Sequence, residues 1–315
     1  VIPEIAVVGI DIGKNSFHIV GQDRRGALVL RQKWSRGQVE ARLANLRPCL
    51  IGMEACTGAH HLSRKLQALG HDARLMPAKY VRPYSKGEKN DYRDAEAIAE
   101  AVQRPTMKFV ATKSADQLDL QALHRVRERL VSQRTGIINQ IRAFLLERGI
   151  AVRQGLRFLR TELPAILAKR TDVLSPRILR IIEDLSGHWR RLDERIENLS
   201  GEIEALGRRL APAVSQAVNE IATLEVVACA SQIGSGALPV DVLPSHALAL
   251  TPRKSGRGAG SVLRRLAEAF RGLPIPVIGS VADGALRFDL RCLEDESGFL
   301  AQLPELALPR AKAGK

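Results

Sequence analysis

The chain has 315 residues, of which 45% are hydrophobic and 26% are charged. This length exceeds the ~100–200 residues of a typical domain, so we expect two domains or one with a large insertion, and no apolar run approaches the ~18 residues of a membrane-spanning helix. The net charge of +14 makes a polyanion the expected partner, and an aromatic content of 4% disfavours a protein that binds single strands by base stacking.

The first 110 residues alternate between strand and helix patterns. The N-terminal stretch has no basic region and carries an acid among its apolar residues, so we expect a first strand and not a signal peptide, in a cytoplasmic protein. The order of elements predicts a mixed α/β sheet with flanking helices, whose first, fourth and fifth strands are parallel. The expected strands are 5–12, 16–21, 27–33, 49–54 and 73–76, and the expected helices lie near 36–46 and 58–69, with another beginning near Asp91.

Four carboxylates stand at positions where strands end and a helix begins. Asp11 interrupts an apolar strand, Glu54 ends a second one, and Asp91 and Asp94 lie three residues apart in the first turn of a helix. Each has a plain structural alternative, as a turn, cap or helix-start acid. Together they predict a cluster that needs a divalent cation, and oxygen ligands suit Mg²⁺ or Mn²⁺. Two such ions in a phosphate-binding protein indicate phosphodiester chemistry.

The basic excess lies in the first half of the chain. Residues 1–110 hold 18 basic and 11 acidic residues, and residues 111–160 hold 10 basic and 4 acidic ones. We expect this half to contact phosphates. The candidates just before the Asp91 helix are Lys79, Arg82, Lys86 and Lys89, whereas His60 and His61 lack metal-ligand spacing and are expected at the surface or near substrate.

Long helices are predicted from residue 113 onward. A basic helix comes first, followed by two interleaved seven-residue repeats that indicate a helical hairpin or a dimer seam. The repeats are Leu185, Leu192, Leu199 and Leu206, and Trp189, Ile196, Ile203 and Leu210. After residue 211 glycine and proline interrupt the pattern, so that only 261–271 predicts a helix and 303–315 is expected to be disordered. We therefore divide the chain into 1–110, a helical and coiled-coil region at 111–211, and a poorly patterned region at 212–315.

The chain resembles the IS110/IS1111 group of transposases over about residues 5–206. The matching segments are GIDIGKNSFHIV with Asp11, GMEACTGAHHL with Glu54, KGEKNDYRDAEAIAEA with Asp91 and Asp94, and the basic segment at 117–150. The resemblance implies an RNase H-like (RuvC-like) domain whose DEDD tetrad binds Mg²⁺. It further implies DNA excision and insertion guided by a structured RNA, oligomerisation through the coiled coil as a dimer or tetramer, and a C-terminal serine that attacks DNA.

The C-terminal region matches that group only loosely. Ser255 is the nearest candidate for the serine, with Ser261 behind it, although a flexible basic Ser/Gly loop explains this segment more simply. We therefore expect residues 212–315 to be a divergent, truncated or frameshifted transposase end.

Three other functions remain open. A degenerate transposase could bind nucleic acid without catalysis, and a nuclease that resolves branched DNA junctions is closely related chemistry. GIDIGKNS also resembles the first phosphate loop of actin-like ATPases and sugar kinases. The four cysteines, Cys49, Cys56, Cys229 and Cys292, have no metal-ligand spacing and are expected to be buried small residues.

Overall fold

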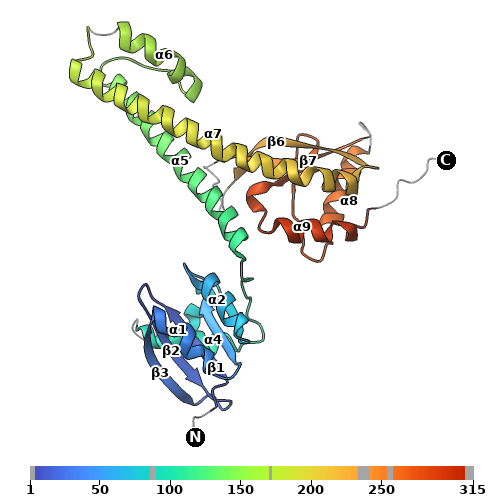
Figure 1. Cartoon of the computed structure of the whole chain (residues 1–315). Helices are drawn as coiled ribbons and strands as arrows, with labels where there is room; N and C mark the ends of the chain where they lie inside the picture. Colours follow the sequence, from blue (N-terminus) through green and yellow to red (C-terminus); the bar gives the residue numbers. More distant parts are fainter. Residues whose placement is uncertain (1–3, 86–89, 170–171, 233–241, 254–257, 309–315) are drawn as a thin grey trace, which may run out of the picture. The chain divides into compact units, whose positions relative to one another are not determined.

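The computed structural model describes residues 4–85, 90–169, 172–232, 242–253 and 258–308. Its contacts divide the chain into two units, Val1–Leu118 and Asp119–Lys315. The first unit runs from blue to cyan in Figure 1, and the second runs from green to red. Among the described residues, no helix has both the length and the apolar character that a membrane span requires.

The first unit is built on a five-stranded mixed sheet, as the sequence predicts. Its strand order is β3-β2-β1-β4-β5, with β1 antiparallel to β2 and parallel to β4, and with β5 parallel to β4. This mixed sheet is the one expected of an RNase H-like domain. The strands are β1 (Val7–Ile12), β2 (Ser16–Gln22), β3 (Leu28–Ser35), β4 (Leu50–Glu54) and β5 (Asp72–Met76).

Helices cover both faces of this sheet because alternate strand residues are apolar on both sides. Val8 and Ile10 pack with helices α1 and α2 in one buried cluster, whereas Val7 packs with helix α4 in another. The helices are α1 (Arg36–Ala44), α2 (Ala59–Ala68), α3 (Ala78–Val81) and α4 (Asp91–Ala101), with a 3-10 turn at Arg82–Tyr84.

Three helices form the first part of the second unit. They are α5 (Ala115–Leu146), α6 (Leu156–Lys169) and α7 (Pro176–Val218). Figure 1 shows α5 and α7 running alongside each other in opposite directions. Ile141 and Ile182 are fully buried in the cluster that the three helices share. The helical hairpin is thus formed within one chain.

The C-terminal part contains a second sheet, which corrects the expectation of a poorly patterned region. Its order is β6-β7-β9-β8 and all its pairings are antiparallel. Leu303–Glu305 forms a 3-10 turn, so the disorder expected from residue 303 is wrong for that turn. The elements are β6 (Ala222–Gln232), β7 (Val242–Pro252), α8 (Ala259–Arg271), β8 (Ser280–Ala282), β9 (Ala285–Asp289), α9 (Glu296–Gln302) and a 3-10 turn at Leu290–Cys292.

Helix α7 joins the two parts of the second unit. Trp189 and Ile196 are buried with α5 and α6, and one heptad later Ile203 and Leu210 are buried against the C-terminal sheet. The boundary expected between residues 211 and 212 therefore falls inside a continuous helix. These four heptad residues are buried in the core of their own chain. The repeat is therefore explained by a hairpin within one chain and does not require a dimer.

Candidate metal centre

The candidate site begins as a row of side chains across three neighbouring strands. Asp11 on β1 is paired with His18 on antiparallel β2. On the other side the parallel register pairs Ile10 with Met53, so the next residues along, Asp11 and Glu54, continue that register at the carboxyl ends of β1 and β4. Residues in register on adjacent strands project from the same face of a sheet. His18, Asp11 and Glu54 consequently share one face.

Two glycines bring helix α4 onto this face. Gly9 and Gly52 are paired in register, each two residues before one of the carboxylates. A Cβ on Gly9 would collide with the backbone of Ala95, and a Cβ on Gly52 would lie 2.8 Å from the Cβ of Val102. Only glycine permits this close approach.

The first turn of α4 supplies the remaining acids. Asn90 caps the helix, its Oδ1 accepting a hydrogen bond from the backbone N–H of Tyr92 at 3.0 Å. The N-cap residue is therefore Asn90, and Asp91 is the first residue of the helix. Asp94 accepts a hydrogen bond from the Oγ of Ser85 at 3.1 Å, which ties the preceding segment to the same turn.

Asp11, His18 and Asp91 meet within a small volume. One ligand atom from each lies within 4.8 Å of the other two. His18 Nδ1 is 3.5 Å from Asp91 Oδ2 and 3.9 Å from Asp11 Oδ2. The side chains of His18 and Asp11 are 9% and 26% exposed, whereas that of Asp91 is 60% exposed, so the cluster opens to solvent on the α4 side.

The negative charges of Glu54 and Asp11 affect the thiol of Cys56. Partial burial, and then the negative charges of Glu54 and Asp11, raise the pKa of Cys56, while the Arg36 guanidinium opposes them. Both carboxylates thus lie within electrostatic range of one thiol. Arg36 also donates hydrogen bonds to the carbonyls of Gly13 and Lys14, and so fixes the turn that follows Asp11.

The donor set fits a divalent cation. Carboxylate oxygens are the ligands that Mg²⁺ and Mn²⁺ prefer, and a cation would neutralise acids that otherwise repel one another. His18 Nδ1 is buried and makes no hydrogen bond within the described part of the chain. A buried polar atom without a partner is unfavourable, and a cation at the cluster would give it one.

The structure brings some of the predicted site residues together and leaves others apart. Asp11 and Asp91 come together, and Glu54 follows the register of Asp11. Among the described residues, the cluster with close ligand atoms includes neither Glu54 nor Asp94. His61 is exposed beside Glu40. Ser255, Lys86 and Lys89 lie outside the described residues.

His18 is the member that the sequence prediction missed. Counting back through the predicted hairpin from its turn would have paired it with Asp11, because the hairpin register follows from the turn. We weighed the acids and the His60–His61 pair as metal ligands but not His18, so this signal was not used.

Comparison with known proteins finds transposases similar to the N-terminal part of the chain. Residues 8–149 match the DEDD family of the IS110 type, described as a transposase. The chain is 41% identical over 202 residues to the transposase of insertion sequence IS1328 from Yersinia enterocolitica, a match that covers 64% of this chain and 60% of the relative. It is 38% identical over 205 residues to the IS1111A transposase of Coxiella burnetii, covering 65% and 56%. The matched part is thus about 60% of these relatives' length.

A different family matches the C-terminal part. Residues 192–294 match the L-seryl-tRNA selenium transferase family. The selenium transferase of Edwardsiella ictaluri is 49% identical over 104 residues, which are 33% of this chain and 22% of that protein. This match begins inside α7 and includes the whole four-stranded sheet. We expected residues 212–315 to be a divergent, truncated or frameshifted transposase end. Most of this region instead lies in a segment that is similar to a selenium transferase.

Proposed function

Because residues 8–149 belong to the IS110/IS1111 family of transposases, we propose that this chain cleaves and exchanges DNA strands of an insertion sequence with a divalent metal ion. The observation that carries this proposal is the cluster of Asp11, His18 and Asp91 on one sheet face. The family favours this chemistry over the actin-like ATPase or sugar kinase alternative.

The acids would bind the ion and orient it toward a phosphate. Asp11, Glu54, Asp91 and Asp94 are the proposed ligands, and Mg²⁺ or Mn²⁺ is the proposed ion. When bound, such an ion stabilises negative charge that develops on a phosphodiester during cleavage. The half-buried position of Asp11 and the fixed start of α4 hold the two central carboxylates before the ion binds, which reduces the cost of reorganisation.

The polyanion partners are proposed as DNA and a structured guide RNA. Exposed arginines on α5 support this proposal, because the helix buries its apolar stripe and leaves Arg125 and Arg129 on the surface. Such contacts to phosphates release counterions, so binding should weaken steeply with salt.

The serine step is the part of the function that the sequence resemblance alone suggests. Ser255 lies within residues 192–294, which match the selenium transferase family. We propose that this chain joins an N-terminal transposase segment to a C-terminal selenium transferase segment within α7. Ser255 then belongs to the second segment, and the serine that completes strand exchange would come from another chain. The match covers 22% of that selenium transferase.

The test compares strand cleavage and exchange on a plasmid that carries the DNA flanking the coding sequence, with its non-coding RNA and Mg²⁺ or Mn²⁺. Wild type should cleave, Asp11→Asn should not, and the exposed control Glu40→Gln should behave as wild type. Cleavage that survives Asp11→Asn would contradict the proposed metal site. Loss of exchange in Ser255→Ala would restore Ser255 as the nucleophile and contradict the joined-chain proposal, whereas binding without cleavage by wild type would identify a non-catalytic remnant.

A further inference from the structure

The imidazole of His18 is buried between two of the proposed metal ligands. His18 is 7% exposed in the middle of β2, and its Nδ1 makes no hydrogen bond with any residue that the structure describes. Both of its carboxylate neighbours are farther than a hydrogen bond of about 2.7–3.2 Å. Nδ1 lies 3.5 Å from Asp91 Oδ2 and 3.9 Å from Asp11 Oδ2. The ring therefore faces both acids, but its Nδ1 is hydrogen-bonded to neither of them.

These separations suit ligands that share one ion. An ion bound at about 2.0–2.1 Å separates its ligand atoms by at most about 4.2 Å. The three ligand atoms lie within 4.8 Å of one another, so shifts of a few tenths of an ångström would complete the coordination. A hydrogen-bonded ion pair, by contrast, would have drawn the nitrogen onto one of the oxygens.

The ring is also held in place by its surroundings. The rings of His18 and Tyr92 form a T-shaped contact, with their centroids 4.8 Å apart. Tyr92 is itself covered by the Arg31 guanidinium, 4.7 Å from its ring centre, and Arg31 lies 4.0 Å from Glu96. Contacts from β3 and α4 thus fix a side chain of β2, as expected of a ligand that must be in position before the ion binds.

We propose that His18 Nδ1 is a direct ligand of the divalent ion, beside Asp11 and Asp91, and that this nitrogen makes the site prefer Mn²⁺ to Mg²⁺. The proposal rests on the proposed function only in requiring that the site bind a metal. Mg²⁺ is best bound by oxygen alone, whereas imidazole nitrogen is a ligand of transition metals. The neutral ring would carry its proton on Nε2 and offer the Nδ1 lone pair to the ion.

The first test detects the nitrogen directly. The full-length protein is loaded with one equivalent of Mn²⁺, and electron spin-echo envelope modulation is recorded. We expect ¹⁴N modulation from a coordinated imidazole, replaced by the ¹⁵N pattern when the protein is grown with [¹⁵N]histidine. Bound Mn²⁺ without nitrogen modulation would overturn the assignment of His18 and leave the metal site intact. Failure to bind Mn²⁺ at all would overturn both the inference and the proposed function.

The second test measures metal affinity by calorimetry. His18→Asn places an amide group near the Nδ1 position, and His61→Gln is the matched control because His61 is exposed in the same unit. We expect His18→Asn to weaken Mn²⁺ binding roughly 10-fold or more, with a smaller change for Mg²⁺, and to lose the nitrogen modulation. His61→Gln should keep both values. Equal loss for the two ions with unchanged modulation would show that His18 only supports the fold.

Discussion

Gly9 on β1 lies so close to Ala95 on α4 that a side chain at position 9 would collide with the Ala95 backbone. The same packing sets where α4 begins relative to the end of β1. The acidic cluster therefore depends on a residue that has no side chain. Metal affinity and packing at Gly9 should change together.

Gly9→Ala should weaken both the fold of the first unit and its metal site. The added methyl group forces α4 away from the sheet, and overpacking of this kind costs about 1–3 kcal/mol. Trp34 lies in the first unit and Trp189 in the second, so urea unfolding followed by fluorescence in a Trp189→Phe background reports the first unit. Mn²⁺ affinity of the folded variant should fall as well.

Gly37→Ala is the matched control for that substitution. Gly37 is in helix α1, and a Cβ there would have no atom within 4 Å from the described residues outside its own helix backbone and chain neighbours. Its unfolding midpoint should equal or exceed that of wild type, since alanine favours a helix. Equal midpoints for Gly9→Ala and Gly37→Ala would show that α4 does not rest on Gly9.

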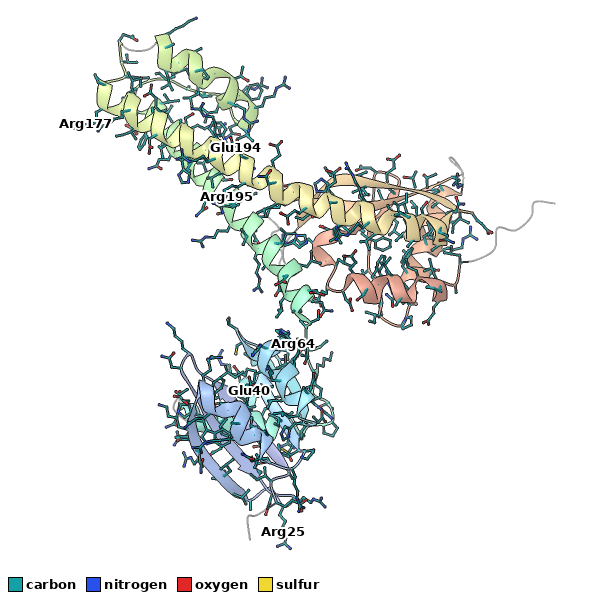
Figure 2. The ribbon with its side chains drawn as sticks, viewed as in Figure 1. Arg25, Glu40, Arg64, Arg177, Glu194 and Arg195 are labelled. Atoms are coloured by element: carbon teal, nitrogen blue, oxygen red, sulfur yellow. The ribbon has the colours of Figure 1, made fainter. Side chains whose placement is uncertain are left out.

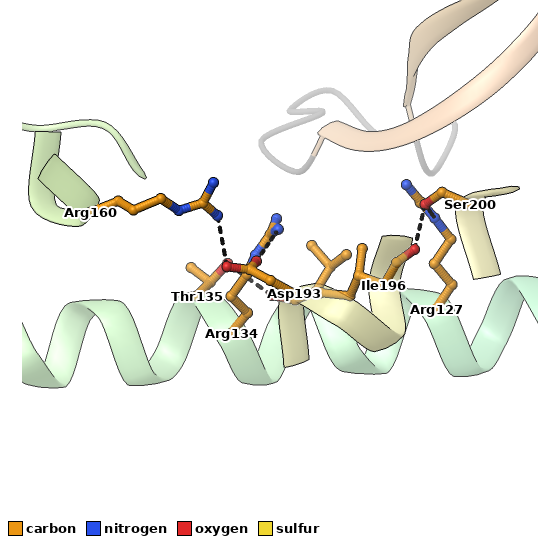
Figure 3. A network of polar contacts seen from close by, with 8 residues as sticks. Arg127, Arg134, Thr135, Arg160, Asp193, Ile196 and Ser200 are labelled. Atoms are coloured by element: carbon orange, nitrogen blue, oxygen red, sulfur yellow. Dashed lines mark hydrogen bonds and ion pairs between the residues drawn. The ribbon is translucent and has the colours of Figure 1, made fainter. Parts of the chain in front are cut away.

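Asp193→Asn should loosen the three-helix part of the second unit. Figure 3 shows Arg134 from α5 and Arg160 from α6 converging on Asp193 of α7, at 3.1 and 2.7 Å. Arg134 and Asp193 are only 18% and 20% exposed, so removing the charge leaves a mostly buried guanidinium without its partner. We expect a loss of about 1–3 kcal/mol, measured by Trp189 fluorescence in a Trp34→Phe background.

The neighbouring residue offers a control. Glu194, labelled in Figure 2, is exposed on the same helix. Glu194→Gln should leave the unfolding midpoint within experimental error of wild type. If Asp193→Asn changed stability no more than Glu194→Gln, the ion pairs of Asp193 would not contribute to the stability of the second unit.

The first sheet was predictable because its strands carry strong local signals. Apolar runs bounded by turn residues located every strand of β1–β5, and right-handed crossovers predicted that β1, β4 and β5 are parallel. The metal site was only half predictable, because the acids stand out in apolar sequence whereas His18 requires the hairpin register. The contact between Gly9 and α4 could not be predicted, because a glycine in a strand does not indicate which element packs against it.

The second sheet was missed for a different reason. Strand β6 is rich in small residues, and Leu224, Val226 and Val227 on it are only partly buried. The central strand β7 is buried on consecutive residues from Ala247 to Leu250, so neither strand shows a strong alternation. The heptad repeat was ambiguous because the same seven-residue spacing serves a core within one chain and a seam between two chains. Ile203 decides between these readings.

Ile203→Ala should lower stability without introducing a dependence on protein concentration. Ile203 is fully buried against the C-terminal sheet, so truncation leaves a cavity and should cost about 2–5 kcal/mol. Unfolding midpoints measured over a hundredfold range of protein concentration test the oligomer reading. A dimer seam through this position would make the wild-type midpoint rise with concentration.

Ile181→Ala on the same helix is the control for that truncation. Ile181 is 37% exposed, so the same chemical change should cost much less. Alanine favours a helix more than isoleucine does, so helix propensity opposes any loss. A loss equal to that of Ile203→Ala would therefore show that burial against the sheet does not explain the effect.

His124→Gln should reduce the loss of stability that the second unit undergoes when the pH falls below about 6.5. Burial, assisted by Arg291 and Arg127 and opposed by Asp289, lowers the pKa of His124, whose Nε2 is buried without a hydrogen bond among the described residues. The unfolded chain then binds a proton near the ordinary histidine pKa of about 6.5 while the folded chain does not, so stability falls as pH drops below that value. Glutamine does not titrate and removes this contribution. Urea midpoints at pH 7.5 and 5.5 should therefore differ less in His124→Gln than in wild type, whereas the exposed control His61→Gln should keep the wild-type difference. An unchanged difference in His124→Gln would mean that His124 is protonated equally in the folded and unfolded chains.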